Sequence, residues 1–251
     1  MQDTKKTIIK LLVITILVLG VYRGSGLTPV EEKRAEATLR NFNQAEAVSF
    51  NLEAELASSR DGFYELIIQQ GYKEENRGSG SFELETVFDG DDTYLEGEYR
   101  YFDSDLYLRL EEGESDQVVG NVFGTDQAVG NWIKTDTYFT FPDMKLVEES
   151  VEVISEDEEI DGKEMYQYEL SVSVEQFTDN ILSMEMMTGK EDLNLYGLGI
   201  EDQLDLVVDA GLGAGLPLFS TGSSPTVNIS ADFFDYNQEK DIGEPIEYLE
   251  I

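Results

Sequence analysis

Two of the side chains that most often carry out chemistry, histidine and cysteine, are absent from this chain. Without them the chain lacks the usual general base, the thiol nucleophile and the common zinc ligand sets. A serine–lysine pair remains, but Ser81, Ser171 and Ser173 fall in strand-like stretches and none has the S-x-x-K spacing. Carboxylates are so frequent that a pair suited to glycoside hydrolysis arises by chance. We therefore expect a protein that is not an enzyme and needs no cofactor.

The acidic stretch Asp89-Gly90-Asp91-Asp92 is the best candidate for a metal site. Clustered carboxylates supply the oxygen ligands that Ca²⁺ prefers, so Asp89, Asp91 and Asp92 are the candidate ligands. The stretch is not an EF-hand loop, because Tyr94 and Arg100 occupy the positions that need Gly and Glu. Asp and Gly are also typical of a hairpin turn. We expect the turn and keep Ca²⁺ binding as the alternative.

A single short motif suggests modification. Asn228-Ile229-Ser230 matches the acceptor sequence for N-glycosylation, although it lies in a strand-like stretch. A pattern of this length recurs by chance, so Asn228 is a candidate site and no more.

The charge balance restricts the partners of the chain. Its 53 acidic residues outnumber 17 basic ones, which gives a formal net charge of −36. Nucleic acid is excluded as a partner, because its binding requires Lys and Arg to neutralise phosphates. The acidic residues are spread from Glu31 to Glu250, which indicates a solvated surface. Adaptation to high salt is one hypothesis, because ions would screen the repulsion among these carboxylates.

The first 27 residues are typical of an export signal. Lys5, Lys6 and Lys10 precede the apolar run from Leu11 to Tyr22, which is shorter than the roughly 20 residues of a spanning helix. If the Lys10 side chain reaches back to the headgroups, the span counts from about Thr7 to Leu27, which is long enough to cross the membrane. Because a good cleavage site is also absent, we expect an uncleaved membrane anchor, with a cleaved signal peptide and secretion as the alternative. The positive-inside rule then places residues 28–251, which we expect to form one domain, outside the cytoplasmic membrane.

The domain begins with a predicted helix and continues as strands. Pro29–Ala45 has apolar residues at helical spacing, whereas from Val48 apolar and polar residues alternate. Short turn-like junctions between the strands predict antiparallel neighbours in a meander. The predicted strands are Val48–Leu56, Gly62–Gln70, Gly80–Phe88, Thr93–Tyr101, Asp105–Glu111, Trp132–Thr137, Val151–Ser155, Glu164–Val174 and Thr226–Phe234, with an extended piece around Pro245–Ile251.

Two further helices are expected late in the chain. Glu175–Met187 has apolar residues at helical spacing, and Ile200–Val208 is the second candidate. The predicted fold class is therefore α+β: a curved antiparallel sheet, an incomplete barrel, covered by helices and preceded by the hydrophobic N-terminal helix.

The order of several motifs resembles the lipoprotein-carrier superfamily, with its LolA-like and LppX/LprG-like folds. An N-terminal helix precedes Ala47-Val48-Ser49-Phe50, and Trp132-Ile133-Lys134, Gly162-Lys163 with Tyr166 and Tyr168, and Asp235-Tyr236-Asn237 follow in the family's order. The resemblance covers roughly Val48 to Pro245. It implies an incomplete barrel closed by helices around an apolar cavity that carries acyl chains. The chain departs from the lipoprotein members because it has no cysteine to acylate.

The leading hypothesis is a membrane-anchored binding protein that holds a lipid or another apolar ligand between sheet and helices. The alternative is a structural or interaction domain of the cell envelope with a filled core, in which the same side chains are plain core. The residues expected to face inward are Phe50, Leu52, Phe82, Leu84, Tyr94, Leu106, Leu108, Tyr168 and Leu170 on the sheet, and Phe177, Ile181, Met184 and Met187 on the covering helix.

Overall fold

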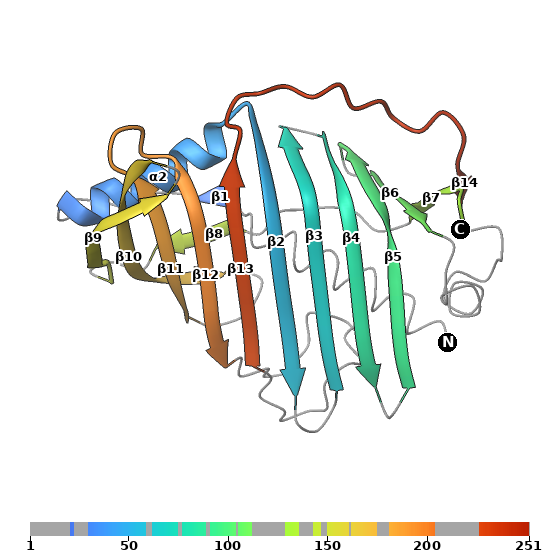
Figure 1. The fold of residues 1–251 in the computed structure, drawn as a ribbon, viewed down its shortest axis with the longest axis horizontal. Helices are drawn as coiled ribbons and strands as arrows, with labels where there is room; N and C mark the ends of the chain where they lie inside the picture. The colour runs from blue at the N-terminus through green and yellow to red at the C-terminus, as the bar shows by residue number, and fades with distance from the viewer. Residues whose placement is uncertain are drawn as a thin grey trace.

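The computed structural model describes residues 21–22, 30–58, 62–74, 77–88, 91–103, 105–111, 129–135, 143–146, 150–160, 162–174, 181–203 and 226–250. The strands of these residues form one open, mostly antiparallel sheet, with one helix beside it (Figure 1). The predicted antiparallel sheet is confirmed.

The first half of the sheet is the expected meander, in which each strand is antiparallel to the next. Most of its strands extend beyond the predicted bounds, because alternation continues into the polar residues at their ends. The strands are β2 (Ala47–Ser58), β3 (Gly62–Glu74), β4 (Arg77–Phe88), β5 (Asp91–Phe102), β6 (Asp105–Leu110) and β7 (Trp132–Thr135).

The second half is joined to the first by β13, which pairs antiparallel with β2. Two strands, β8 and β9, pair with different parts of β10, and the short strands β1 (Val21–Tyr22) and β14 (Leu249–Glu250) pair in parallel with β8 and β7. The remaining strands are β8 (Asp143–Leu146), β9 (Glu152–Ile160), β10 (Lys163–Val174), β11 (Ile181–Gly189), β12 (Leu195–Gln203) and β13 (Thr226–Phe234).

Both late helices were predicted wrongly, because the described parts of these segments are strands. In β11, Leu182, Met184 and Met186 are buried while Ser183 and Glu185 point the other way, which is the period of two of a strand. Consecutive methionines satisfied the helical and the strand period equally well. The start of the second predicted helix belongs to β12, where Leu198 and Ile200 are buried. The sheet is therefore not covered by these two segments as helices.

Alternation gives the sheet two unlike faces. On β2, Val48, Phe50 and Leu52 are buried on one side, which we call the inner face. Glu53 and Glu55 lie on the opposite side, the outer face. Helix and sheet thus meet on the apolar side, and the carboxylates remain on the other.

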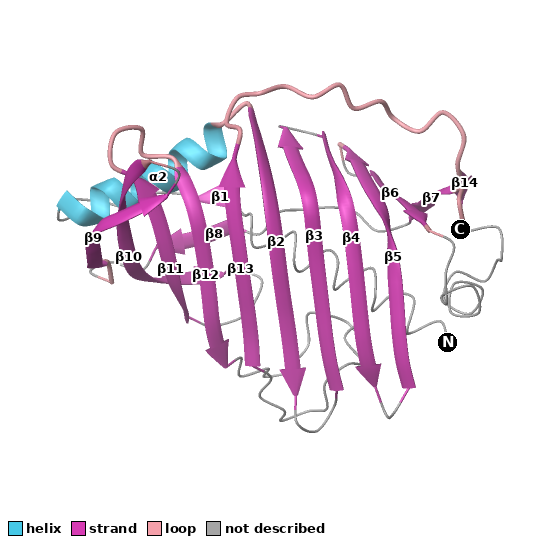
Figure 2. Cartoon of the chain, in the orientation of Figure 1, coloured by secondary structure: helices cyan, strands magenta, loops and turns pink. Residues whose placement is uncertain are grey.

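The expected N-terminal helix of the domain is confirmed as α2 (Val30–Gln44). Ala35, Leu39 and Phe42 form its buried stripe, and the Phe42 ring meets the ring of Phe233 on β13 edge-on, with centroids 4.8 Å apart. Figure 2 shows the helix at the end of the sheet that contains β9 to β12. The hydrophobic N-terminal segment lies outside the described residues except for β1, and no described helix is long and apolar enough to cross a membrane.

Residues 235–250 form a C-terminal strap along one end of the strands, from β13 to β14 (Figure 1). The backbone N–H of Asn237 donates to the carbonyl of Ala47 (2.7 Å), and Arg100 donates to the carbonyl of Gly243 (2.6 Å). The Tyr107 hydroxyl donates to the Glu244 carboxylate (2.8 Å). These contacts fasten the strap to strands that are distant from it in sequence.

Candidate ligand-binding face

Nine of the side chains predicted to face inward share the inner face and one hydrophobic cluster. All nine are buried, and they come from strands in both halves of the sheet, so the inner face is a continuous apolar surface from β10 to β6. These residues are Phe50, Leu52, Phe82, Leu84, Leu106, Leu108, Tyr168, Leu170 and Met184.

Three of the predicted residues lie on the outer face instead. Tyr94 is 44% exposed and donates to Glu83 and Glu96, and partial burial of its hydroxyl together with these two carboxylates raises its pKa to about 12. Ile181 is 58% exposed at the start of β11. Met187 is partly buried and lies over its cross-strand partner Gly197 on the outer side. Phe177 lies outside the described residues.

Aromatic rings lie flat on the inner face where three glycines form the sheet beneath them. Phe50 is paired with Gly71, and a Cβ added to Gly71 would come within 2.5 Å of the Phe50 ring. Tyr99 is paired with Gly80, and the corresponding distance to its ring is 2.7 Å. Tyr101 covers Gly78, its direct partner, in the same way. Glycine thus lets each ring lie flat across the neighbouring strand, so the side chains project less from the sheet in this part of the face.

A bulge in β3 produces the pairing between Phe50 and Gly71. The register shifts between Phe50 and Leu52, and Gln70 adopts a positive φ of 51°. The backbone N–H of Gln70 donates to the side-chain oxygen of Asn51 (3.1 Å), which satisfies a donor that the ladder leaves free. The extra residue places Gly71 beneath the ring.

Two tyrosines of this face, Tyr99 and Tyr101, were missed by the sequence analysis. Tyr99 and Tyr101 are buried on β5, and burial raises the pKa of both hydroxyls. The signal was present, because Gly78 and Gly80 on β4 have the same spacing as the two tyrosines on β5. Only the strand register brings the two pairs together.

Helix α2 contacts the inner face at one end. Arg34 lies over the ring of Tyr166 on β10 (4.8 Å), and Asn41 donates to the carbonyl of Leu193 (3.2 Å). At the other end of the helix, Lys73 of β3 lies over the ring of Phe42 (4.4 Å). Burial at this position lowers the pKa of Lys73 to about 8.

The outer face carries carboxylates in register across neighbouring strands. Glu55 is opposite Glu65, and Glu65 is opposite Glu85, so this row places a carboxylate on each of three adjacent strands about 4.8 Å apart. Burial raises the pKa of Glu65, and Glu53, Glu85, Glu55 and Glu83 add to the effect. Neighbouring carboxylates thus oppose the ionisation of Glu65, in addition to the effect of burial.

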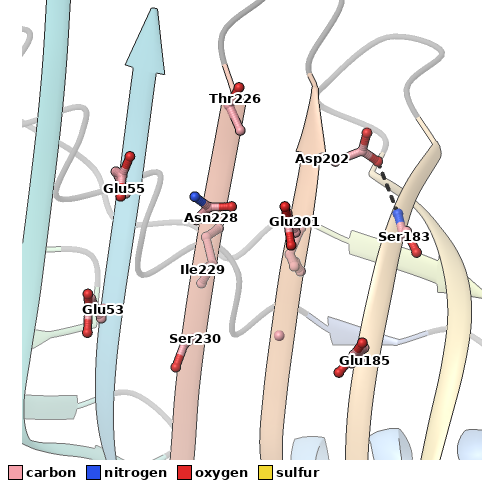
Figure 3. Close-up of a pocket in the computed structure, with 12 residues that line it drawn as sticks. Glu53, Glu55, Ser183, Glu185, Glu201, Asp202, Thr226, Asn228, Ile229 and Ser230 are labelled. Carbon is pink, nitrogen blue, oxygen red and sulfur yellow. Dashed lines mark hydrogen bonds between the residues drawn. The ribbon is translucent and has the colours of Figure 1, made fainter. Parts of the chain in front are cut away.

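A shallow groove of about 930 Å³ lies on the outer face over β11, β12, β13 and β2. Figure 3 shows Glu185 on β11 and Glu53 and Glu55 on β2, on either side of the two central strands. Gly199 contributes no side chain to β12, which hollows the surface between them. The groove is polar and acidic, so it is unsuited to an apolar ligand.

The side chains of the candidate metal site lie outside the described residues, whereas the candidate glycosylation site is described. Asp89 and the side chains of Asp91 and Asp92 lie outside what the structure describes, and the described residues contain no group of ligands that could hold a metal ion. The register pairs Phe88 with Asp91, as the predicted hairpin requires. Asn228 lies within β13, partly buried, and lines the outer groove.

Comparison with known proteins gives similarities in structure alone. No family model and no curated protein matches the sequence. Among solved structures, LprF from Mycobacterium bovis is similar with a TM-score of 0.46 and 9% identity, over 88% of this chain and 99% of that one. A LolA superfamily protein from Nitrosomonas europaea has a TM-score of 0.22 and 12% identity, over 87% and 96% of the two chains.

Proposed function

We propose that this protein is a non-enzymatic binding protein that holds a lipid or another apolar ligand against its inner face, at the outer side of a cytoplasmic membrane. The N-terminal sequence supports the membrane location, because Lys5, Lys6 and Lys10 precede an apolar run and the positive-inside rule keeps them in the cytoplasm. The carboxylates of the outer face suit a domain surrounded by water.

The observation that carries the proposal is the form of the inner face. It is apolar across strands from both halves of the sheet, whereas the described helix packs at one end of it. Between these strands, Phe50 and Tyr99 lie flat over glycines, so the side chains rise less from the sheet than upright rings would. A broad apolar surface with a low centre is suited to acyl chains, which need apolar contact along their whole length.

A structural or interaction domain of the cell envelope, with the same side chains as plain core, is the second candidate. The burial of the inner face favours it equally, because core residues and cavity residues are both shielded from water. The two functions differ in whether an apolar molecule can enter.

Binding of diphenylhexatriene, a hydrocarbon probe, to the full chain in amphipol separates these functions. Trp132 is the single tryptophan of the chain, so energy transfer from it reports probe that lies close to the protein and not probe in protein-free amphipol. We expect saturable transfer. Leu84→Phe adds bulk to the inner face and should weaken binding about tenfold, equivalent to roughly 1.4 kcal/mol.

Glu83→Gln is the matched control, because residue 83 is the neighbour of Leu84 on the same strand but lies on the outer face. It should leave probe binding unchanged. Absence of saturable transfer in the unchanged chain would instead support the filled core.

A further inference from the structure

Tyr99 places a hydroxyl donor within the hydrophobic cluster of the inner face, two residues from Tyr101 on the same side of β5. Its side chain is 1% exposed and belongs to the same cluster as Leu84 and Leu95. Within the part of the chain that the structure describes, its hydroxyl oxygen has no hydrogen-bond partner. A donor is therefore buried where the described residues offer it no acceptor.

Such an arrangement costs stability. Buried tyrosine hydroxyls usually have a hydrogen-bond partner, and a buried hydroxyl without one loses the hydrogen bonds that water would give it in the unfolded chain. Phenylalanine would fill the same space above Gly80 without this cost, because the ring makes the contact. The hydroxyl is consistent with a partner that is not among the described residues.

The position of the oxygen indicates where that partner would lie. The ring crosses from β5 over β4, and the hydroxyl oxygen is 3.0 Å from the place of a Gly80 Cβ, which would project from the inner face. The oxygen is thus above the sheet, on the side to which we assign the apolar ligand. Burial raises its pKa well above the usual value, so it remains a donor at neutral pH.

We propose that Tyr99 donates a hydrogen bond to an uncharged acceptor in the bound ligand, such as the carbonyl oxygen of an acyl ester. This inference rests on the proposed function and adds a polar requirement to it. An uncharged group is favoured over a carboxylate, because the net charge of −36 repels anions from the protein. Tyr99 then distinguishes acyl esters from plain hydrocarbons of the same length.

The test compares two probes on the full chain in amphipol, both followed by energy transfer from Trp132. Diphenylhexatriene has no polar atom, whereas the methyl ester of parinaric acid carries a carbonyl acceptor. Tyr99→Phe removes the hydroxyl and keeps the ring. We expect this variant to bind the ester about three- to tenfold more weakly, the range of one hydrogen bond, and diphenylhexatriene with unchanged affinity.

Tyr107→Phe is the matched control, because it removes a buried hydroxyl on the outer face, where Glu244 is the partner. It should leave both affinities unchanged. If Tyr99→Phe binds the two probes with the affinities of the unchanged chain, or weakens both equally, the hydrogen bond is refuted while the apolar site stands. If the unchanged chain binds neither probe, both proposals fail.

Discussion

The ring of Tyr99 lies directly over Gly80, its partner across the strands, so that a Cβ at position 80 would fall 2.7 Å from the ring. This contact, together with that of Phe50 and Gly71, makes the centre of the inner face flat. The contact matters for the proposed function. Because position 80 has no side chain, the Tyr99 ring can lie close to the sheet, and the surface that a ligand would contact is flatter there.

Gly80→Ala should therefore destabilise the protein. The added methyl group has to displace the Tyr99 ring or the backbone near Gly71, and overpacking of this kind costs about 1–3 kcal/mol. Urea unfolding would measure the loss. Gly199→Ala is the control, because its Cβ would meet Glu185 at an ordinary 3.8 Å, and it should be neutral or slightly stabilising. Equal effects of the two substitutions would contradict the close contact.

The two buried tyrosine hydroxyls on opposite faces should respond differently to removal. Tyr107→Phe breaks a hydrogen bond of 2.8 Å to Glu244 on the strap, and it should lower the free energy of unfolding by about 1 kcal/mol. Tyr99→Phe removes a hydroxyl without a partner among the described residues, and it should not destabilise the ligand-free protein. Denaturation of both variants after organic extraction of bound molecules checks the contrast, which a stability loss at Tyr99 would contradict.

Lys73 should make stability depend on pH in an alkaline range. Its pKa is about 8 in the folded protein and has the ordinary lysine value of 10.5 in the unfolded chain, so between these values the unfolded chain binds the extra proton. Stability should consequently rise as the pH increases from about 8 to 10. Lys73→Met keeps an apolar stem against Phe42 and should remove this rise. Urea midpoints across this range test the point, and parallel curves for the two proteins would disprove it.

Ionised Glu65 should destabilise the folded protein through repulsion from neighbouring carboxylates, and salt should reduce this effect. Its raised pKa means that the folded protein binds the proton more tightly, so this group costs stability as the pH rises through the folded pKa. Glu65→Gln should stabilise the protein at neutral pH by about 0.2–1 kcal/mol, the range for like charges on neighbouring strands. Glu247→Gln on the exposed strap is the control.

The gain at Glu65 should shrink in molar salt, because ions screen the repulsion. Melting curves of both proteins in dilute buffer and in molar salt measure this gain. They also test adaptation to high salt, since the unchanged chain should melt at a higher temperature in molar salt than in dilute buffer. Equal melting temperatures in both would oppose that hypothesis.

The alternation of apolar and polar residues predicted most of the strands of the sheet. It was least informative where consecutive apolar residues fit both the strand period and the helical period. Alternation from Val48 onward identified β2 and its buried face correctly. Met184 was expected to face inward from a helix, and it does so from a strand, whereas Met187 falls on the outer face. Consecutive apolar residues fit both periods, so only the pairing of β11 with β10 and β12 decides between them.

The contacts within the candidate site depend on how neighbouring strands are aligned. Short sequence patterns do not give this register. Tyr94 could have been placed correctly, because Glu96, Glu98 and Arg100 mark the even positions of β5 as the outer face. The contact of Tyr99 with Gly80 joins two strands and required the structure. The groove beside Gly199 likewise arises from four strands that the sequence does not place together.

Native mass spectrometry of the full chain, isolated from its host without added lipid, tests the central claim most directly. If the inner face holds an apolar ligand, a fraction of the protein should carry an additional mass that organic extraction releases as an acyl-containing molecule. Leu84→Phe should lower that fraction and Glu83→Gln should not. A bare protein mass in repeated preparations, with nothing in the organic extract, would contradict the account and favour a filled core.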